Sequence, residues 1–279
     1  MRRPALAGHL GVRAPDLPLL RHLADPLDVE AQVAALAANG FAGVSDNYLL
    51  LRDEAVQCRI GEAVRRHGLR MGSFVHDPLR WNEPAWIDGS ALATIDASAV
   101  AAERTGSRCI TCITGRVADE NAAPQRRSMA ETLRRAADRL GSVGVTLCVE
   151  PTHPFFAPGL LIEQVEEALE VVALAGHPHV RIGFDIGHVA LHGRDPVEAI
   201  GLAAGMIGNV QIADVPAEGP GRVEPGAGTL DWVAIVGALD TADYAGLIEL
   251  ELEPAETGEA GERAMLSRLA GLGLVGERA

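Results

Sequence analysis

Four polar side chains stand at or near the ends of successive apolar stretches in the second half of this 279-residue chain. They are Glu150, Asp185, Gln211 and Glu251. The stretches are typical of parallel strands separated by helices, and the carboxyl ends of such strands meet at one rim of a sheet. Carboxylates that crowd together repel each other unless protons or a cation intervene, and oxygen ligands suit Mg²⁺ or Mn²⁺. We therefore predict that these four side chains bind one divalent metal ion.

An ordinary alternative exists for each acid taken singly. One Asp or Glu at the end of a strand is commonly a salt-bridged residue or a helix cap. The predicted metal site therefore depends on the convergence of four such groups on neighbouring strands, and on no one of them alone.

Three further residues are expected beside the four. His188 follows Asp185 by three residues and is predicted to contact substrate. Arg222 lies in a loop rich in glycine and proline at the same rim. Its guanidinium could hold a substrate hydroxyl or carboxylate, or it could simply be solvated. His76 follows the strand-like stretch 69–75 and could form a wall of the substrate pocket.

The last strand-like stretch contains a second glutamate, Glu249, two residues before Glu251. The two share a face of the strand because side chains alternate with a period of two. Glu251 is nearer the carboxyl end and is therefore the predicted ligand. Glu249 would lie one layer lower in the sheet, where it needs a partner such as Arg181, or it would be a surface acid if it tilts outward.

The chain as a whole alternates strand-like and helical stretches eight times. The expected strands span residues 5–12, 41–45, 69–75, 107–113, 145–149, 180–184, 207–213 and 245–251. Eight such units in a chain of this length predict an α/β fold, a closed (β/α)8 barrel, formed as a single domain over residues 1–279. A doubly wound open sheet is the alternative, but the glycine-rich fingerprint that usually follows its first strand is missing.

Charge and hydropathy exclude several classes of partner. A net charge of −14 opposes binding to nucleic acid or to an anionic membrane surface. The apolar runs are shorter than the ~18 residues of a membrane span. The basic start, Met1 to Pro4, is not followed by the apolar stretch of a signal peptide, so we expect a cytoplasmic protein. Cys109 and Cys112 lie three apart on one strand and should face opposite sides, which favours buried strand cysteines over a zinc or redox pair.

The motifs around these residues resemble the xylose-isomerase-like sugar isomerase/epimerase superfamily, and most closely its hydroxypyruvate isomerase branch. The matching features are Glu150 after an apolar strand, Asp185-x-x-His188, the segments 211–216 and 221–228, and Glu251-x-x-Pro254. The resemblance covers about residues 145–254. A glutamine at position 211, where many ketose epimerases have histidine, favours the hydroxypyruvate isomerase branch.

The resemblance implies roles for these residues. One divalent ion, Mn²⁺ or Mg²⁺ or alternatively Co²⁺, would be held by Glu150, Asp185, Gln211 and Glu251. The two glutamates would move a proton on and off carbon, and substrate oxygens would be bound by His188 and Arg222. The family also implies self-association into a homo-oligomer.

The chemistry of such a site agrees with these roles. A carbon-bound proton beside a carbonyl is too weakly acidic for a free carboxylate, and a metal ion that stabilises the enediolate makes its removal feasible. We expect isomerisation or epimerisation of a small sugar or hydroxy-keto acid. One alternative is a lyase that expels a leaving group from the same enediolate. A DNA-repair endonuclease, which the charge disfavours, and a non-catalytic barrel subunit are further alternatives.

Overall fold

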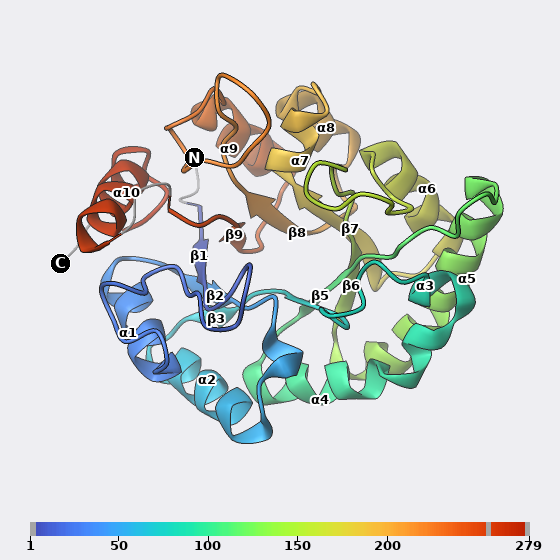
Figure 1. Cartoon of the computed structure of the whole chain (residues 1–279), viewed down its shortest axis with the longest axis horizontal. Coiled ribbons are helices and arrows are strands. Elements are labelled where there is room, and N and C mark those ends of the chain that lie inside the picture. The colour runs from blue at the N-terminus through green and yellow to red at the C-terminus, as the bar shows by residue number, and fades with distance from the viewer. Residues whose placement is uncertain (1–3, 255–257, 277–279) are drawn as a thin grey trace.

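Parallel strands surround the centre of the molecule and helices surround the strands (Figure 1). The computed structural model describes residues 4–254 and 258–276. Met1 to Arg3, part of the basic start for which the sequence predicts no signal peptide, lie outside the described residues. Within these ranges nine strands form one sheet, in the order β3-β2-β1-β9-β8-β7-β6-β5-β4. Their bounds are β1 Leu6–His9, β2 Gly43–Ser45, β3 Arg70–Met71, β4 Phe74–Val75, β5 Cys109–Cys112, β6 Thr146–Val149, β7 Val180–Asp185, β8 Ile207–Ile212 and β9 Ile248–Leu250. Because β1 pairs with β9, the first and last strands close the predicted α/β barrel.

The third predicted strand, 69–75, is divided into β3 and β4, which makes nine strands from eight units. The division falls at Gly72 and Ser73, whose backbone groups bond to side chains. The Ser73 amide donates to the Glu249 carboxylate at 2.9 Å, and the Gly72 carbonyl accepts from the Ser107 hydroxyl at 2.6 Å. Since β3 pairs with β2 and β4 pairs with β5, the same stretch still joins the two edges of the sheet.

The helices lie outside the barrel in chain order (Figure 1). They are α1 Val29–Ala38, α2 Glu54–Arg66, α3 Ala85–Asp88, α4 Ile95–Thr105, α5 Ala122–Leu140, α6 Val165–Ala175, α7 Ile186–Leu191, α8 Pro196–Leu202, α9 Trp232–Thr241 and α10 Glu259–Gly271. Aspartate side chains cap five of them by accepting backbone N–H groups: Asp28, Asp53, Asp185, Asp195 and Asp231. No helix in the described ranges is both long and apolar enough to cross a membrane.

Two helices begin beside polar contacts. Helix α4 begins at Ile95, directly after Thr94, whose hydroxyl donates to the Asp77 carboxylate at 2.8 Å. Helix α7 was not predicted, and it starts directly after Asp185. The Asp185 carboxylate accepts the His188 amide at 2.9 Å and so caps α7 from the end of its own strand.

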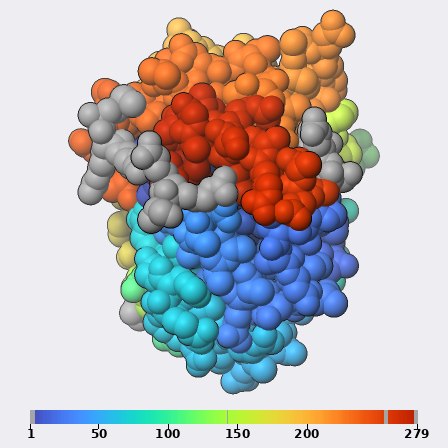
Figure 2. Space-filling model, turned by 90° about the vertical axis from the view of Figure 1, so that its left-hand side faces the viewer, coloured from blue at the N-terminus to red at the C-terminus, as the bar shows by residue number. Residues whose placement is uncertain are grey.

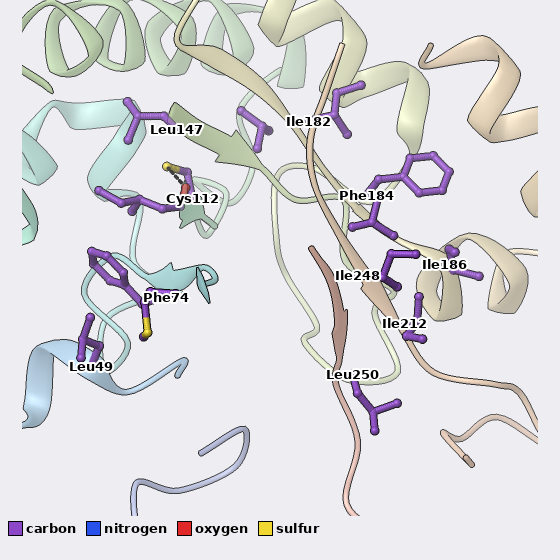
Figure 3. Packing of buried hydrophobic residues seen from close by; sticks show 14 of the residues in the cluster. Leu49, Phe74, Cys112, Leu147, Ile182, Phe184, Ile186, Ile212, Ile248 and Leu250 are labelled. Carbon is purple, nitrogen blue, oxygen red and sulfur yellow. Dashed lines mark hydrogen bonds between the residues drawn. The ribbon is translucent and has the colours of Figure 1, made fainter. Parts of the chain in front are cut away.

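The hydrophobic core fills the space between the strands and the helices. Figure 3 shows side chains of β6, β7, β8 and β9 within it, among them Leu147, Phe184, Ile212 and Leu250. The end of the chain packs on its start: helix α10 lies against the N-terminal segments in Figure 2. There the Glu262 carboxylate accepts the amides of His22 and Leu23 at 2.9 and 3.0 Å.

Candidate active site

The carboxyl ends of β6, β7, β8 and β9 bring the four predicted residues to one rim of the barrel. Glu150 directly follows β6, Asp185 ends β7, Gln211 lies in β8 and Glu251 directly follows β9. Asp185 and Gln211 are register partners on neighbouring strands. Glu150, Asp185 and Gln211 are buried and Glu251 is nearly so. The structure therefore places three carboxylates and one amide around a common point.

Arg222 reaches into the middle of this group. Its Nη2 atom lies 2.7 Å from Asp185 Oδ2, 3.3 Å from Glu251 Oε2 and 3.0 Å from His188 Nε2. The guanidinium also lies over the ring of Phe156, 4.7 Å from its centroid. Of the two sequence-based readings of Arg222, a substrate-site cation and a solvated loop residue, the structure contradicts the second.

The loop that carries Arg222 is fixed by a buried carboxylate at its base. Asp214 accepts the amides of Val215, Gly226 and Leu230 at 2.9–3.1 Å and the Trp232 indole N–H at 2.8 Å. The backbones of Asp214 and Val223 also pair across the loop. The loop is therefore held at both ends while its middle lies over the carboxylates.

The donor set at the rim fits a divalent metal ion. Ligand atoms of Glu150, Asp185 and His188 all lie within 4.8 Å of one another. Gln211 donates its Nε2 to Glu251 Oε2 at 3.2 Å, and its Oε1 is buried with no hydrogen-bond partner among the described residues. A buried carbonyl oxygen without a partner is costly unless a donor or a cation meets it. This buried group could therefore bind a metal, and its oxygen-rich chemistry suits Mg²⁺ or Mn²⁺.

Burial and crowding raise the affinity of two of the carboxylates for protons. Burial, together with the nearby charge of Asp185, raises the pKa of Glu150 to about 8. Burial raises the pKa of Glu251 to about 7, although Arg222 works in the opposite direction. Two glutamates that titrate near neutral pH are suited to accepting and returning a proton.

The other ionisable groups of the site, His188, Asp185 and Arg222, each keep one protonation state at neutral pH. Burial lowers the pKa of His188 to about 4, so its ring is neutral at neutral pH. Burial alone would raise the pKa of Asp185, but His188, Arg222 and the His188 amide outweigh it and lower that pKa. The neighbouring Glu251, Asp185 and Glu150 raise the pKa of Arg222 against the effect of burial. Asp185 is therefore an anion and Arg222 a cation in the folded site.

Two contacts of the site were not predicted from the sequence. Asn47, two residues beyond β2, donates its Nδ2 to Glu251 Oε1 at 2.9 Å. Phe156 packs edge-on against the His188 ring, with 5.4 Å between centroids, and lies under Arg222. The position of Asn47 just after an expected strand was a usable signal, whereas nothing local distinguishes Phe156 from any other loop aromatic.

His76 is held in a network of its own. Its Nδ1 lies 2.8 Å from the Ser98 hydroxyl, its Nε2 lies 3.2 Å from the Thr94 hydroxyl, and its ring packs on Trp86. Among the described residues no hydrogen bond or ion pair joins His76 to Glu150 or the other rim carboxylates. The predicted substrate contact of His76 therefore remains a prediction. Such a contact would require His76 to break a hydrogen bond to the Ser98 or Thr94 hydroxyl.

The expectation for Glu249 needs correction. Its carboxylate is buried, but it pairs with Ser73, accepting the amide at 2.9 Å and the hydroxyl at 2.5 Å. Arg181 instead donates to the Gly205 carbonyl. The amide and the hydroxyl of Ser73 donate to the two carboxylate oxygens of Glu249, so Glu249 has hydrogen-bond partners without an arginine.

Comparison with known proteins places this geometry in a family. The model of the xylose isomerase-like TIM barrel family matches residues 33–269. The chain belongs to that family. Hydroxypyruvate isomerase of Escherichia coli is 30% identical over 184 residues, which are 66% of this chain and 68% of that protein. A protein of Cupriavidus necator named 2-oxo-tetronate isomerase is 27% identical over 236 residues, 82% of this chain and 88% of the relative.

Solved structures agree on the fold. A Brucella melitensis protein described as an AP endonuclease of family 2 superposes with a TM-score of 0.81 at 24% identity. The match covers 96% of this chain and 98% of that one. At this level of identity the likeness concerns the barrel alone, so the name of that protein carries no inference about DNA. The sequence-based assignment of the barrel and of the family is confirmed.

Proposed function

We propose that this protein is a divalent-metal-dependent isomerase of a small hydroxy-keto acid or unphosphorylated sugar. The observation that carries the proposal is the buried cluster of Glu150, Asp185 and His188, whose ligand atoms lie within 4.8 Å of one another, with Glu251 held beside it by Arg222 and Gln211. The names of the two relatives, hydroxypyruvate isomerase and 2-oxo-tetronate isomerase, support isomerisation of a 2-oxo acid with an adjacent hydroxyl group.

The metal would be held by Glu150, Asp185, Gln211 and Glu251, and we infer Mn²⁺ or Mg²⁺, with Co²⁺ as the alternative. When bound, such an ion supplies positive charge that stabilises the oxygens of an enediolate. The carboxylates of Glu150 and Glu251 belong to strands on either side of Asp185 and Gln211. One would remove a proton from the hydroxyl-bearing carbon, and the other, or the same one, would return it to the neighbouring carbon.

Substrate oxygens would be bound by His188 and Arg222. Arg222 Nε is buried and has no partner in the part of the chain that the structure describes, so one guanidinium donor remains for a substrate carboxylate or hydroxyl. The neutral His188 ring receives Arg222 Nη2 at its Nε2, and its Nδ1 is buried without a partner. Phe156 covers these two side chains and would exclude water from one side of the substrate.

The first test is metal content by elemental analysis of purified protein. Wild type is expected to hold about one divalent ion per chain after incubation with Mn²⁺ or Mg²⁺. The ion should be lost from Glu150→Gln and Asp185→Asn. It should be retained in Glu163→Gln, because the carboxylate of Glu163 has no described contact with the four ligands. A wild type that binds no ion would refute the metal site.

The second test follows proton transfer directly. Hydroxypyruvate in ²H₂O with the metal-loaded enzyme should exchange hydrogen at carbon 3 and form the isomeric aldehyde, measured by NMR. Glu251→Gln should abolish both signals if Glu251 moves the proton. Metal binding without exchange or isomerisation would keep the site and reject this substrate class, while a dehydrated product from a keto-sugar would assign a lyase. Light scattering would test the self-association that the family implies.

A further inference from the structure

A second hollow lies at the opposite end of the barrel from the carboxylate site. It has a volume of about 400 Å³ and is bordered by Arg70 and Gly72 of the third strand region, Cys109 at the start of β5 and Gly208 near the start of β8. An adjoining hollow of about 430 Å³ shares Arg108, Cys109, Gly208, Tyr244 and Gly246 with it. Because Gln211 and Glu251 stand at the carboxyl ends of β8 and β9, whose amino-terminal parts line the hollow, this hollow is separate from the site described above.

Glycines at this end of the barrel let side chains pack directly against the backbone of the strands. A side chain at position 208 would begin 2.6 Å from the Cys148 sulfur, and one at position 72 would begin 2.8 Å from Glu249 Oε1. The interiors of such barrels are usually filled by large branched side chains. Here the corresponding positions include Ser73, Asn209 and Glu249, so the inner end of the hollow is polar.

The buried wall of the hollow has an acceptor without a donor. Asn209 is 1% exposed, and its Nδ2 donates to the Ser73 hydroxyl at 3.2 Å. Its Oδ1 is buried with no partner among the described residues, which costs roughly 1–3 kcal/mol when nothing donates to it. Within the same part of the chain the carboxylate of Glu249 accepts from Ser73 alone and keeps further lone pairs. Both groups would accept hydroxyl hydrogens of a ligand.

The mouth of the hollow is cationic in a chain of net charge −14. Arg65, Arg70 and Arg108 border it, and none of the three has a carboxylate within 4 Å among the described residues. Their guanidinium groups bond to backbone carbonyls: Arg70 donates to Ala245 and Gly246, and Arg108 donates to Val143. Each guanidinium therefore keeps donors for an anion, and its planar fork matches a carboxylate or a phosphate.

We propose that this basal hollow binds a small anionic polyol, with the anion at Arg70 and Arg108 and the hydroxyl groups directed to Asn209 and Glu249. The ligand is not the substrate of the rim site, because the hollow lies at the amino-terminal ends of the strands. The proposal does not depend on the proposed isomerase activity, since it is tested by binding alone.

Cys109 provides a local probe, because it borders both hollows and is half-buried, whereas Cys112 and Cys148 are buried. Metal-loaded protein would be treated with iodoacetamide with and without D-glycerate, and modification would be followed by peptide mass spectrometry. At about ten times the Kd of glycerate, occupancy should slow Cys109 alkylation roughly tenfold. Cys58, the other half-buried cysteine, lies in α2 and should react at an unchanged rate.

Variants and partial ligands locate the bound anion. The Arg70→Met/Arg108→Met double variant should lose the protection, with its folding checked by circular dichroism. An Arg222→Met variant, altered only at the other end of the barrel, should keep it. Glycerol, which lacks the anion, should protect weakly, and glycerol 3-phosphate in place of glycerate distinguishes a phosphate from a carboxylate ligand.

Three results would overturn the proposal. Cys109 that does not react in the free protein would mean that the hollow is closed to small molecules. Alkylation of Cys109 that neither glycerate nor glycerol 3-phosphate slows would mean that neither anion binds there. Protection that survives the double arginine variant, or that disappears in Arg222→Met, would place the ligand elsewhere.

Discussion

Asp214 holds the loop that positions Arg222, and an Asp214→Asn substitution tests how much of the site depends on that loop. The two carboxylate oxygens accept four hydrogen bonds: Oδ1 from the amides of Val215 and Leu230, and Oδ2 from the Gly226 amide and the Trp232 indole. Asparagine has the same shape, but one of its two positions becomes an NH₂ group that faces donors.

Whichever way the amide turns, two of the four hydrogen bonds are lost. A hydrogen bond to a charged acceptor contributes roughly 1.5–3 kcal/mol, so the substitution should cost the closed loop about 3–6 kcal/mol. The side chain of Asp214 is fully buried, and water cannot replace the lost bonds without opening the loop. At roughly 2–4 °C per kcal/mol for a protein of this size, the melting temperature should fall by about 10 °C if the loop and the barrel unfold together.

Trypsin reports directly on the loop. In the closed loop the Arg222 guanidinium is paired with Asp185 and Glu251, so cleavage after Arg222 should be slow. In Asp214→Asn we expect rapid cleavage after Arg222, which gives fragments 1–222 and 223–279. We also expect kcat/KM for the proposed isomerisation to fall at least tenfold. Trp232→Phe removes only the indole bond and should show a smaller change in the same direction. Unchanged cleavage and melting temperature in Asp214→Asn would refute this account of the loop.

Three further predictions concern other parts of the barrel. Asn47→Ala removes a hydrogen bond to the Glu251 carboxylate, which should cost roughly 1.5–3 kcal/mol and lower kcat/KM about 10- to 100-fold, as steady-state kinetics would show. Burial lowers the pKa of His9 to about 4, below its value of about 6.5 in the unfolded chain. The folded protein therefore favours the neutral ring, and the free energy of unfolding falls as the pH drops from about 6.5 to about 4. Denaturant unfolding should show wild type losing about 3 kcal/mol more than His9→Gln over this range. Gly72→Ala should lower the free energy of unfolding by about 1–3 kcal/mol, because the new Cβ would lie 2.8 Å from Glu249 Oε1.

Each of the three has a control or an outcome that contradicts it. Gly201→Ala places a methyl group in open space on α8 and should be neutral or slightly stabilising, so an equal loss in both glycine variants would disprove the clash at position 72. A His9→Gln variant with the same pH dependence as wild type would mean that other groups cause it. A normal kcat/KM in Asn47→Ala would show that Glu251 is held without this bond.

The barrel was predictable from the sequence because each strand is a local apolar run followed by a helix. The four rim residues were predictable for the same reason: a polar residue that ends a buried parallel strand must emerge at the carboxyl rim. Glu150, Asp185 and Glu251 each stand at such a position. Pattern and position were sufficient there, since no contact between distant segments had to be known.

Several features that the sequence did not reveal depend on contacts between distant segments. The break between β3 and β4 exists because Glu249, 176 residues later in the chain, bonds to Ser73. Asn47 reaches Glu251 across 204 residues. Strand periodicity fixes which face a side chain occupies, but it does not say which neighbour meets it. The guess of Arg181 for Glu249 was wrong for this reason.

The charges at the rim argue for the ion on their own. Three carboxylates, Glu150, Asp185 and Glu251, face a single fixed cation, Arg222, while the His188 ring is neutral. With all three acids ionised, two negative charges remain in a buried space, and that is energetically costly unless they are neutralised. Burial raises the pKa of Glu150 to about 8 and that of Glu251 to about 7, so protons would offset part of this charge in the protein alone. One divalent ion bound to this cluster would supply the same two charges and would leave both glutamates free of those protons.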